Sequence, residues 1–222
     1  MSNGQKPIKH FNTAHVVGRI MGVPETKRDR EGKGAEYLKI NVNCASRDNG
    51  NAIAYGQMRN HKKYRALLDH IKEHPEGKFY HFQAFYNQFP EDRANEGSRR
   101  LSSFFFWDWW PDEEEGRDPR AVFILKGVLT GIKDDKVSLQ MERDSNKDGQ
   151  GNQIIELFDL FVLAPQFLNL VTVGDTVEVV GEMMSKKGGD RYGRTDSASP
   201  VLPYIRESVK LLRSGGGTPF DE

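Results

Sequence analysis

The fold of this chain is set around two aromatic stretches, KFYHFQAFYNQF at residues 78–89 and SFFFWDWW at residues 103–110. Residues 79–110 hold twelve of the 23 aromatic residues and all three Trp. Side chains alternate between the two faces of a β-strand. A barrel core needs only one of these faces, so the other must contact something else. In the first stretch one face carries Tyr80, Phe82, Ala84 and Tyr86, and the other carries Phe79, His81, Phe85 and Phe89.

An internal repeat decides which face is buried. The segment VGRIMGV at residues 17–23 resembles the segment KGVLTGI at residues 126–132, and each contains two glycines four residues apart. Such self-similarity indicates two copies of one structural unit. Aligning Gly77 with Gly174 places the aliphatic run from Val177 to Met183 beside the run from Tyr80 to Tyr86. Because aliphatic side chains belong in a core, Tyr80 and its partners are predicted to be buried, and Phe79, His81, Phe85 and Phe89 to point outward.

The order of predicted elements in the first copy is three strands, one helix and two strands. Apolar residues alternate with polar residues in the strands, and the helix shows a period of 3.6 residues. Residues 24–36 are predicted to be a basic loop. This order is that of an OB-fold, a five-stranded barrel with a helix between its third and fourth strands. The strands are expected at 13–23, 37–44, 52–58, 78–89 and 101–110, and the helix at 61–73.

The second copy repeats the pattern after a Pro- and Glu-rich stretch. Strands are expected at 122–132, 136–143, 153–163, 177–184 and 204–212, with a short helix or turn at 165–171. The chain is therefore predicted to be mainly β, with tandem OB-fold barrels of five strands each. The expected organisation is a flexible arm at 1–12, a first OB-fold at 13–110, a linker at 111–120, a second OB-fold at 121–213, and a flexible Gly-rich acidic tail at 214–222.

The distribution of charged, apolar and cysteine residues limits the classes of protein to which this chain could belong. The net charge is zero, yet residues 1–110 hold eighteen Lys and Arg against twelve Asp and Glu, and residues 111–222 hold fourteen against twenty. A basic half that carries the aromatic stretches suits phosphate contact. No apolar run approaches the roughly 20 residues that span a bilayer. The lone Cys44 and the absence of a signal-like N-terminus indicate a cytoplasmic protein.

No catalytic constellation is evident, so the chain is predicted not to be an enzyme and to need no cofactor. His70 and His74 have metal-chelating spacing on the predicted helix, but a solvated pair is the better interpretation. The run from Asp144 to Gly149 half-resembles a calcium loop, but Ile155 occupies the place of its acidic twelfth residue. No metal site is therefore expected.

Aromatic side chains interleaved with cations are typical of proteins that bind single-stranded nucleic acid. Bases stack on the rings at about 1–3 kcal/mol each, while Lys and Arg contact the phosphates. An OB-fold binds on its second and third strands and on the loops after its first and fourth strands. We therefore predict a binding path of Lys27, Arg28, Arg30, Lys33, Tyr37, Lys39, Tyr55, Arg59, Phe85, Arg99, Arg100, Trp107 and Trp109.

Three features together resemble bacterial and phage single-stranded DNA-binding proteins. They are the alternating strand after Gly77, the segment from the third strand to the helix, and the Gly-rich tether that ends in Thr218-Pro219-Phe220-Asp221-Glu222. The resemblance implies an OB-fold protein that coats single-stranded DNA in replication, recombination or repair. It also implies that the tail, with Pro219, Phe220, Asp221 and Glu222, recruits replication or recombination proteins.

The sequence is also compatible with two other functions. The aromatic excess is also what a core or a subunit interface needs, so the barrels could form a protein-interaction scaffold without nucleic acid. Single-stranded RNA is a second alternative, because nothing in the sequence identifies a contact to a 2′-hydroxyl. A homo-oligomer, most simply a dimer, is expected, and no membrane association is expected.

Overall fold

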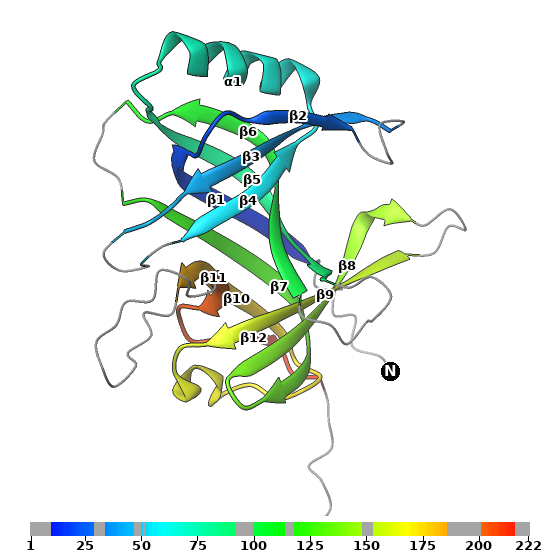
Figure 1. The fold of residues 1–222 in the computed structure, drawn as a ribbon. Helices are drawn as coiled ribbons and strands as arrows, with labels where there is room; N and C mark the ends of the chain where they lie inside the picture. The colour runs from blue at the N-terminus through cyan, green and yellow to red at the C-terminus, as the bar shows by residue number, and fades with distance from the viewer. Residues whose placement is uncertain are drawn as a thin grey trace, which may run out of the picture. The chain divides into compact units, whose positions relative to one another are not determined.

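A computed structural model describes residues 10–28, 34–46, 50, 52–91, 100–113, 118–147, 153–185 and 201–215 (Figure 1). The residues form two compact units. One contains residues 13–123 with 182–204, and the other contains residues 124–181 with segments before 13 and after 204. The domain boundaries given above remain predictions, and each barrel is described by itself.

The first barrel follows the predicted element order closely. Its elements are β1 (Phe11–Ile20), β2 (Glu25–Arg28), β3 (Glu36–Asn43), β4 (Ile53–Met58), α1 (His61–Glu73), β5 (Phe79–Pro90) and β6 (Arg100–Pro111). β1 pairs with β5, β5 with β6, β4 with β3, and β3 back with β1. The one parallel pair of this ring is β4 with β6. The ring of pairings is therefore closed in OB-fold order, as predicted.

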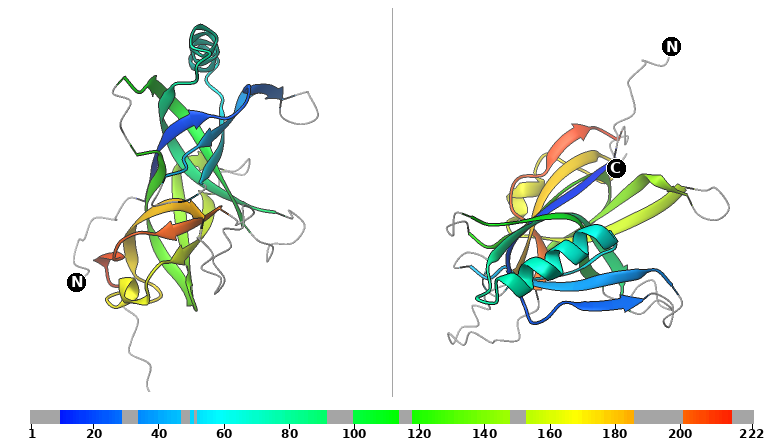
Figure 2. Two further views of the ribbon diagram at one scale, coloured as in Figure 1. Left: turned by 60° about the vertical axis from the view of Figure 1, so that its left-hand side comes forward. Right: turned by 90° about the horizontal axis from the view of Figure 1, so that it is seen from above.

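The core of the first barrel is the inward face of each strand. Tyr80, Phe82, Ala84 and Tyr86 are all buried, which confirms the face assigned from the repeat. On β3 the inward residues Leu38, Ile40 and Val42 are fully buried. Helix α1 lies across one end of this barrel (Figures 1 and 2) and buries Tyr64 and Leu67.

The second barrel repeats the ring. It contains β7 (Arg120–Lys133), β8 (Lys136–Lys147), β9 (Gln153–Val162), the 3-10 turn η1 (Pro165–Leu168), β10 (Thr176–Ser185) and β11 (Val201–Ile205), with the short β12 (Lys210–Arg213) beside β10. Neighbouring strands run β7, β8, β9, β11, β10 and return to β7. The mainly β, tandem OB-fold prediction is therefore confirmed, with a single 3-10 turn in the place that α1 occupies in the first copy.

Two predicted elements were wrong in detail. Residues 25–28 form the strand β2, not a loop, and pair with β3 from Glu25–Lys39 to Arg28–Glu36. All four residues of β2 are exposed, so no hydrophobic alternation marks this strand in the sequence. The predicted strand at 204–212 is two strands, because residues 206–209, of which the first three are exposed, separate β11 from β12.

The first strand also ends earlier than predicted. β1 stops at Ile20, and Gly22, which was expected inside the strand, has a φ of 64° that a strand cannot accommodate. Gly18 keeps its predicted place within β1. A side chain there would overlap the backbone carbonyl of Asn43 on β3, and Gly127 stands in the same relation to Gln140 on β8. The repeat found in the sequence thus marks a close crossing of strands in each barrel, of β1 with β3 and of β7 with β8.

Candidate nucleic-acid interface

The outward face of the first barrel collects rings and cations from neighbouring strands. Strand register places Lys27 of β2 opposite Tyr37 of β3, and Asn41 of β3 opposite Tyr55 of β4. Because directly opposed residues share a face, these side chains lie on one surface. Tyr55 is 48% exposed and Lys39 is exposed, while the alternating residues of β3 fill the core.

Arg59 joins this surface to β6. Its guanidinium carbon lies 6.0 Å from the ring centroid of Tyr37 and 5.9 Å from that of Phe105. Phe105 faces outward because Phe104 and Phe106 on either side of it are buried. A cation held near two aromatic rings is attracted to both ring faces. The arrangement orders Arg59 between two rings.

A β-bulge in the β5–β6 pair sets the position of Trp107. The register shifts between Gln83 and Ala84, so that Trp107 has no partner of its own on β5. A bulge commonly re-aims a side chain in this way. Trp107 is 42% exposed, and its ring centroid lies 6.4 Å from that of Phe85, which is 45% exposed. The Lys63 ammonium, from α1, lies 5.9 Å from the Trp107 ring.

We call these outward residues the aromatic–cationic face. They come from six elements, β2, β3, β4, α1, β5 and β6, and from the connection between β4 and α1, and they combine flat apolar rings with positive charges. Such a surface can stack unpaired bases and contact a phosphate backbone at the same time. The face comprises Lys27, Tyr37, Lys39, Tyr55, Arg59, Lys63, Phe85, Phe105 and Trp107.

Seven of the predicted path residues lie on this face, and three described ones lie elsewhere. Arg28 is on the other side of β2 from Lys27, with its guanidinium 3.7 Å from a Glu36 carboxylate oxygen. Arg100 shares the face of β6 that carries the buried Phe104. Trp109 points toward α1. The predicted residues Arg30, Lys33, Arg99, Pro219, Phe220, Asp221 and Glu222 lie outside the described residues.

Sequence reasoning missed Phe105 and Lys63. Phe105 could have been found, because strict alternation with a buried Phe104 and Phe106 places it outward. Lys63 had no such signal. It lies on the polar side of the predicted helix, and only the packing of α1 against β6 brings it beside Trp107.

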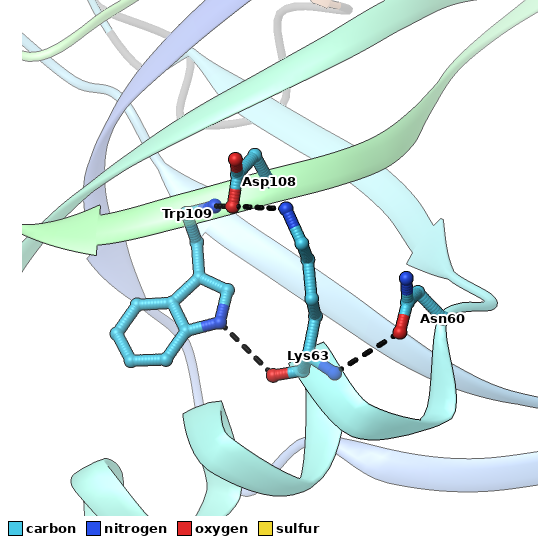
Figure 3. A network of polar contacts seen from close by, with 4 residues as sticks. All are labelled: Asn60, Lys63, Asp108 and Trp109. Atoms are coloured by element: carbon cyan, nitrogen blue, oxygen red, sulfur yellow. Dashed lines mark hydrogen bonds and ion pairs between the residues drawn. The ribbon is translucent and has the colours of Figure 1, made fainter.

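A small polar network fixes α1 against β6 (Figure 3). Asn60 caps the helix by accepting a hydrogen bond from the Lys63 backbone N–H at 3.2 Å. The Lys63 ammonium pairs with Asp108 at 2.6 Å, and Asp108 also accepts the Trp109 backbone N–H at 2.9 Å. The Trp109 indole N–H donates to the Lys63 carbonyl at 3.0 Å. Trp109 is thereby a structural contact between strand and helix.

This network predicts a pH-dependent contribution to stability. The hydrogen bond from the Lys63 ammonium, helped by the Trp109 N–H, lowers the pKa of Asp108 below its ordinary value. A carboxyl group whose pKa is lower in the folded state stabilises the fold above its unfolded pKa, and this stabilisation is lost as pH falls through the folded pKa. Asp108→Asn is therefore expected to melt below wild type at pH 7, with the difference closing as pH falls through the lowered pKa of Asp108.

The measurement is the melting temperature of both proteins from pH 7 to pH 2. The matched control is Asp69→Asn, which removes the carboxylate of an exposed pair with Lys72 on α1. Exposed pairs contribute little, so this variant should follow wild type at every pH. A difference for Asp108→Asn that stays constant down to pH 2 would contradict the assigned ion pair.

The corresponding face of the second barrel has a different character. On β9 the outward residues Ile155 and Leu157 are 54% and 40% exposed, and they face Glu142 and Gln140 of β8. One cation–ring contact is present there, with the Lys136 ammonium 4.9 Å from the Phe161 centroid. Among the residues that the structure describes, the interleaved rings and cations are therefore found on the first barrel.

Among the described residues, no group of three or more His, Cys, Asp or Glu side chains is arranged to hold a metal ion. The rings of His70 and His74 lie 4.4 Å apart, and His74 contacts Glu76 at 3.2 Å. No helix among the described residues is long and apolar enough to cross a membrane.

Fold and surface together define a tandem OB-fold protein with an aromatic–cationic face on its first barrel. No family model matches the sequence, and no curated protein matches it. Among solved structures, the wild-type single-stranded DNA-binding protein from Thermus aquaticus matches 97% of this chain and 98% of its own, with a TM-score of 0.56 and 14% identity. A deletion mutant of that protein matches with a TM-score of 0.57, 13% identity, and coverage of 96% and 99%. This chain therefore has the fold of a single-stranded DNA-binding protein with two OB-folds.

Proposed function

We propose that this protein binds single-stranded DNA with little sequence preference and without catalysing a reaction. The observation that carries the proposal is the arrangement of Arg59 between Tyr37 and Phe105, beside the exposed pair Phe85 and Trp107. Exposed rings held on rigid strands offer stacking surfaces at a low entropic cost, and neighbouring cations neutralise phosphates.

The same geometry favours single strands over duplex. Bases in a duplex are stacked on one another, so their faces are not accessible to Trp107 or Tyr55. Stacking on a ring does not distinguish bases, because every base has a π-face. The positions of the cations are suited to a backbone that follows the strands across the sheet. Lys39 is exposed, and Arg59 and Lys63 already lie near rings that would stack bases.

The biological setting is part of the proposal. We infer that the protein coats and protects single-stranded DNA during replication, recombination or repair, in a bacterial or phage-infected cell. The Pro219-Phe220-Asp221-Glu222 tip is proposed to recruit other proteins of these processes, and the chain is proposed to act as a homodimer. Both ideas rest on the sequence and on the resemblance described above.

The test is a tryptophan-fluorescence titration with oligo-dT, with duplex DNA and poly-rU alongside. Wild type is expected to respond strongly to dT and weakly to duplex. Affinity should fall as salt rises, with a logarithmic slope of about −0.7 per contacted phosphate. Trp107→Ala should weaken dT binding by roughly 5- to 150-fold, the value of one base stacked on a ring.

The control for this variant is its melting temperature, which should match that of wild type because Trp107 is 42% exposed. A weaker Trp107→Ala protein that is also partly unfolded would not count as support. Equal binding of rU and dT would make RNA the better candidate. No response to any polymer, with no retention on a single-stranded DNA column, would replace the proposal with a protein-interaction role for the aromatic–cationic face.

A further inference from the structure

A second group of outward rings lies on the first barrel, beyond the aromatic–cationic face. It combines His15 of β1, His81 of β5 and Trp110 of β6. The Trp110 indole is parallel to the His81 ring within 4°, at 5.2 Å between centroids, and lies 5.7 Å and 19° from the His15 ring. The two imidazoles are 5.2 Å apart and also nearly parallel. The indole is thus stacked on a pair of imidazoles.

The imidazole pair is held by polar contacts on both sides. His81 Nδ1 lies 3.1 Å from His15 Nε2, and His81 Nε2 lies 3.5 Å from a carboxylate oxygen of Asp112. His81 and Asp112 are 1% and 7% exposed, and the Asp112 backbone N–H donates to the Phe79 carbonyl at 2.9 Å. Since both nitrogens of His81 are engaged, its ring cannot turn without breaking a contact.

The buried state of His81 also corrects an expectation. The residue lies on the outward face of β5, as predicted, but Trp110 and His15 cover it. Trp110 itself remains 38% exposed. A large apolar ring that is packed against other rings and still partly exposed to solvent is preorganised for stacking. Little conformational freedom is lost when a ligand binds to such a ring.

A cation lies on the same side of β5 as this stack, two residues along the strand from His81. Arg19 of β1 is exposed, lies opposite Phe79 of β5 in the strand register, and places its guanidinium carbon 4.7 Å from the Phe79 ring centroid. Phe79 and His81 are on the same side of β5. Among the described residues of β6 and its end, Asp112 contacts His81 and is buried, and Asp108 is paired with Lys63. Arg19 is an exposed cation of the described residues on this side of β5 that a phosphate could contact.

We propose that Trp110 is a further nucleobase-stacking position, with Arg19 beside it to contact a phosphate and with His81 as the residue that positions the indole. Trp107 and Trp110 are three residues apart on β6, about 10 Å along a strand. The single strand would then continue along β6 from the aromatic–cationic face to Trp110. This inference rests on the proposed function, because it extends the same path.

The test uses oligo-dT of increasing length and two variants of Trp110. Trp110→Ala should bind long oligo-dT roughly 5- to 150-fold more weakly than wild type, whereas Trp110→Phe, which keeps a stacking ring, should stay close to wild type. Very short oligo-dT, which occupies only the aromatic–cationic face, should not distinguish the two variants. In a protein with Trp107→Phe and Trp109→Phe, Trp110 is the only indole, and long oligo-dT should quench its fluorescence.

The role of His81 is tested in the same single-tryptophan protein. His81→Ala should lower the fluorescence anisotropy of Trp110 and weaken binding of long oligo-dT, because the indole loses its support. His81→Phe restores a flat ring under the indole and should recover both readouts. A merely structural role would instead lower the melting temperature in both variants without separating them in anisotropy.

The outcomes separate this inference from the proposed function. If Trp107→Ala weakens binding and Trp110→Ala does not, the protein is a single-strand binder and the Trp110 position is wrong. If Trp110→Ala changes the oligomeric state in light scattering and leaves the affinity per chain unchanged, Trp110 is a subunit contact and the inference is overturned. If wild type binds no oligo-dT, the proposed function itself fails.

Discussion

Replacing Trp109 with Ala is expected to lower the free energy of unfolding of the first barrel by about 3 kcal/mol, the value typical of truncating a packed aromatic side chain. The indole donates a hydrogen bond to the Lys63 carbonyl and packs edge-on against His70 and Tyr80, at 5.6 and 6.0 Å between centroids. Its loss removes the contact that anchors α1 to β6. The melting temperature should fall by more than about 10 °C.

The matched control is Trp107→Ala, two residues away on the same strand. Trp107 is 42% exposed, so its removal should change the melting temperature by no more than a few degrees. Trp109→Phe adds a second comparison, because it keeps an aromatic ring but loses the hydrogen bond, at a cost of about 1 kcal/mol, and part of the packed ring area. Equal destabilisation by Trp107→Ala and Trp109→Ala would contradict the different roles assigned to these residues.

Gly18→Ala is expected to destabilise the first barrel by about 3 kcal/mol, at the upper end of the usual cost of overpacking. The added methyl group would overlap the carbonyl of Asn43 and lie 2.9 Å from a methyl carbon of Val42. A carbonyl in a strand cannot move aside without disturbing the pairing of β1 with β3. That pairing closes the ring of strands, so the strain acts on the whole barrel.

Thermal or urea unfolding would measure this effect, with Gly131→Ala as the control. Gly131 lies in β7, and the nearest atom to a methyl group there is the Ser138 Cβ at 3.6 Å, an ordinary contact. Gly131→Ala should therefore be neutral or slightly stabilising, since Ala restricts the unfolded chain more than Gly does. A Gly18→Ala protein as stable as wild type would show that β1 and β3 do not cross as closely as described.

Much of this fold could be predicted because its signals are local. The alternation of Leu38, Ile40 and Val42 with polar residues identifies β3 and its buried face from the sequence alone. The predicted helix at 61–73 matches α1, since its apolar spacing and the break after it are both contained in the segment. Gly18 and Gly127 occupy equivalent positions, each where one strand crosses close to the next. Their recurrence in the sequence therefore predicted two barrels of the same kind.

Part of the candidate surface followed from the same alternation. Tyr37, Lys39, Tyr55 and Phe85 are outward residues of strands whose inward residues are unmistakably apolar. Arg28 shows the limit of this reasoning. It is as basic as Lys27, but it lies on the other side of a strand that the sequence did not reveal.

The remaining features depend on contacts between segments distant in the chain. β2 is a strand because β3 supplies its hydrogen bonds, and its own exposed, charged residues carry no period. Alternation after the buried Phe106 already places Trp107 outward. The bulge opposite Gln83 then shifts the alternation, so that Trp109 faces α1 and Trp110 shares the outward side with Trp107, and no local pattern marks the position of the bulge. His81 is buried because Trp110 and His15 close over it. Alternation along a strand specifies which face a side chain takes, but only tertiary packing decides what covers that face.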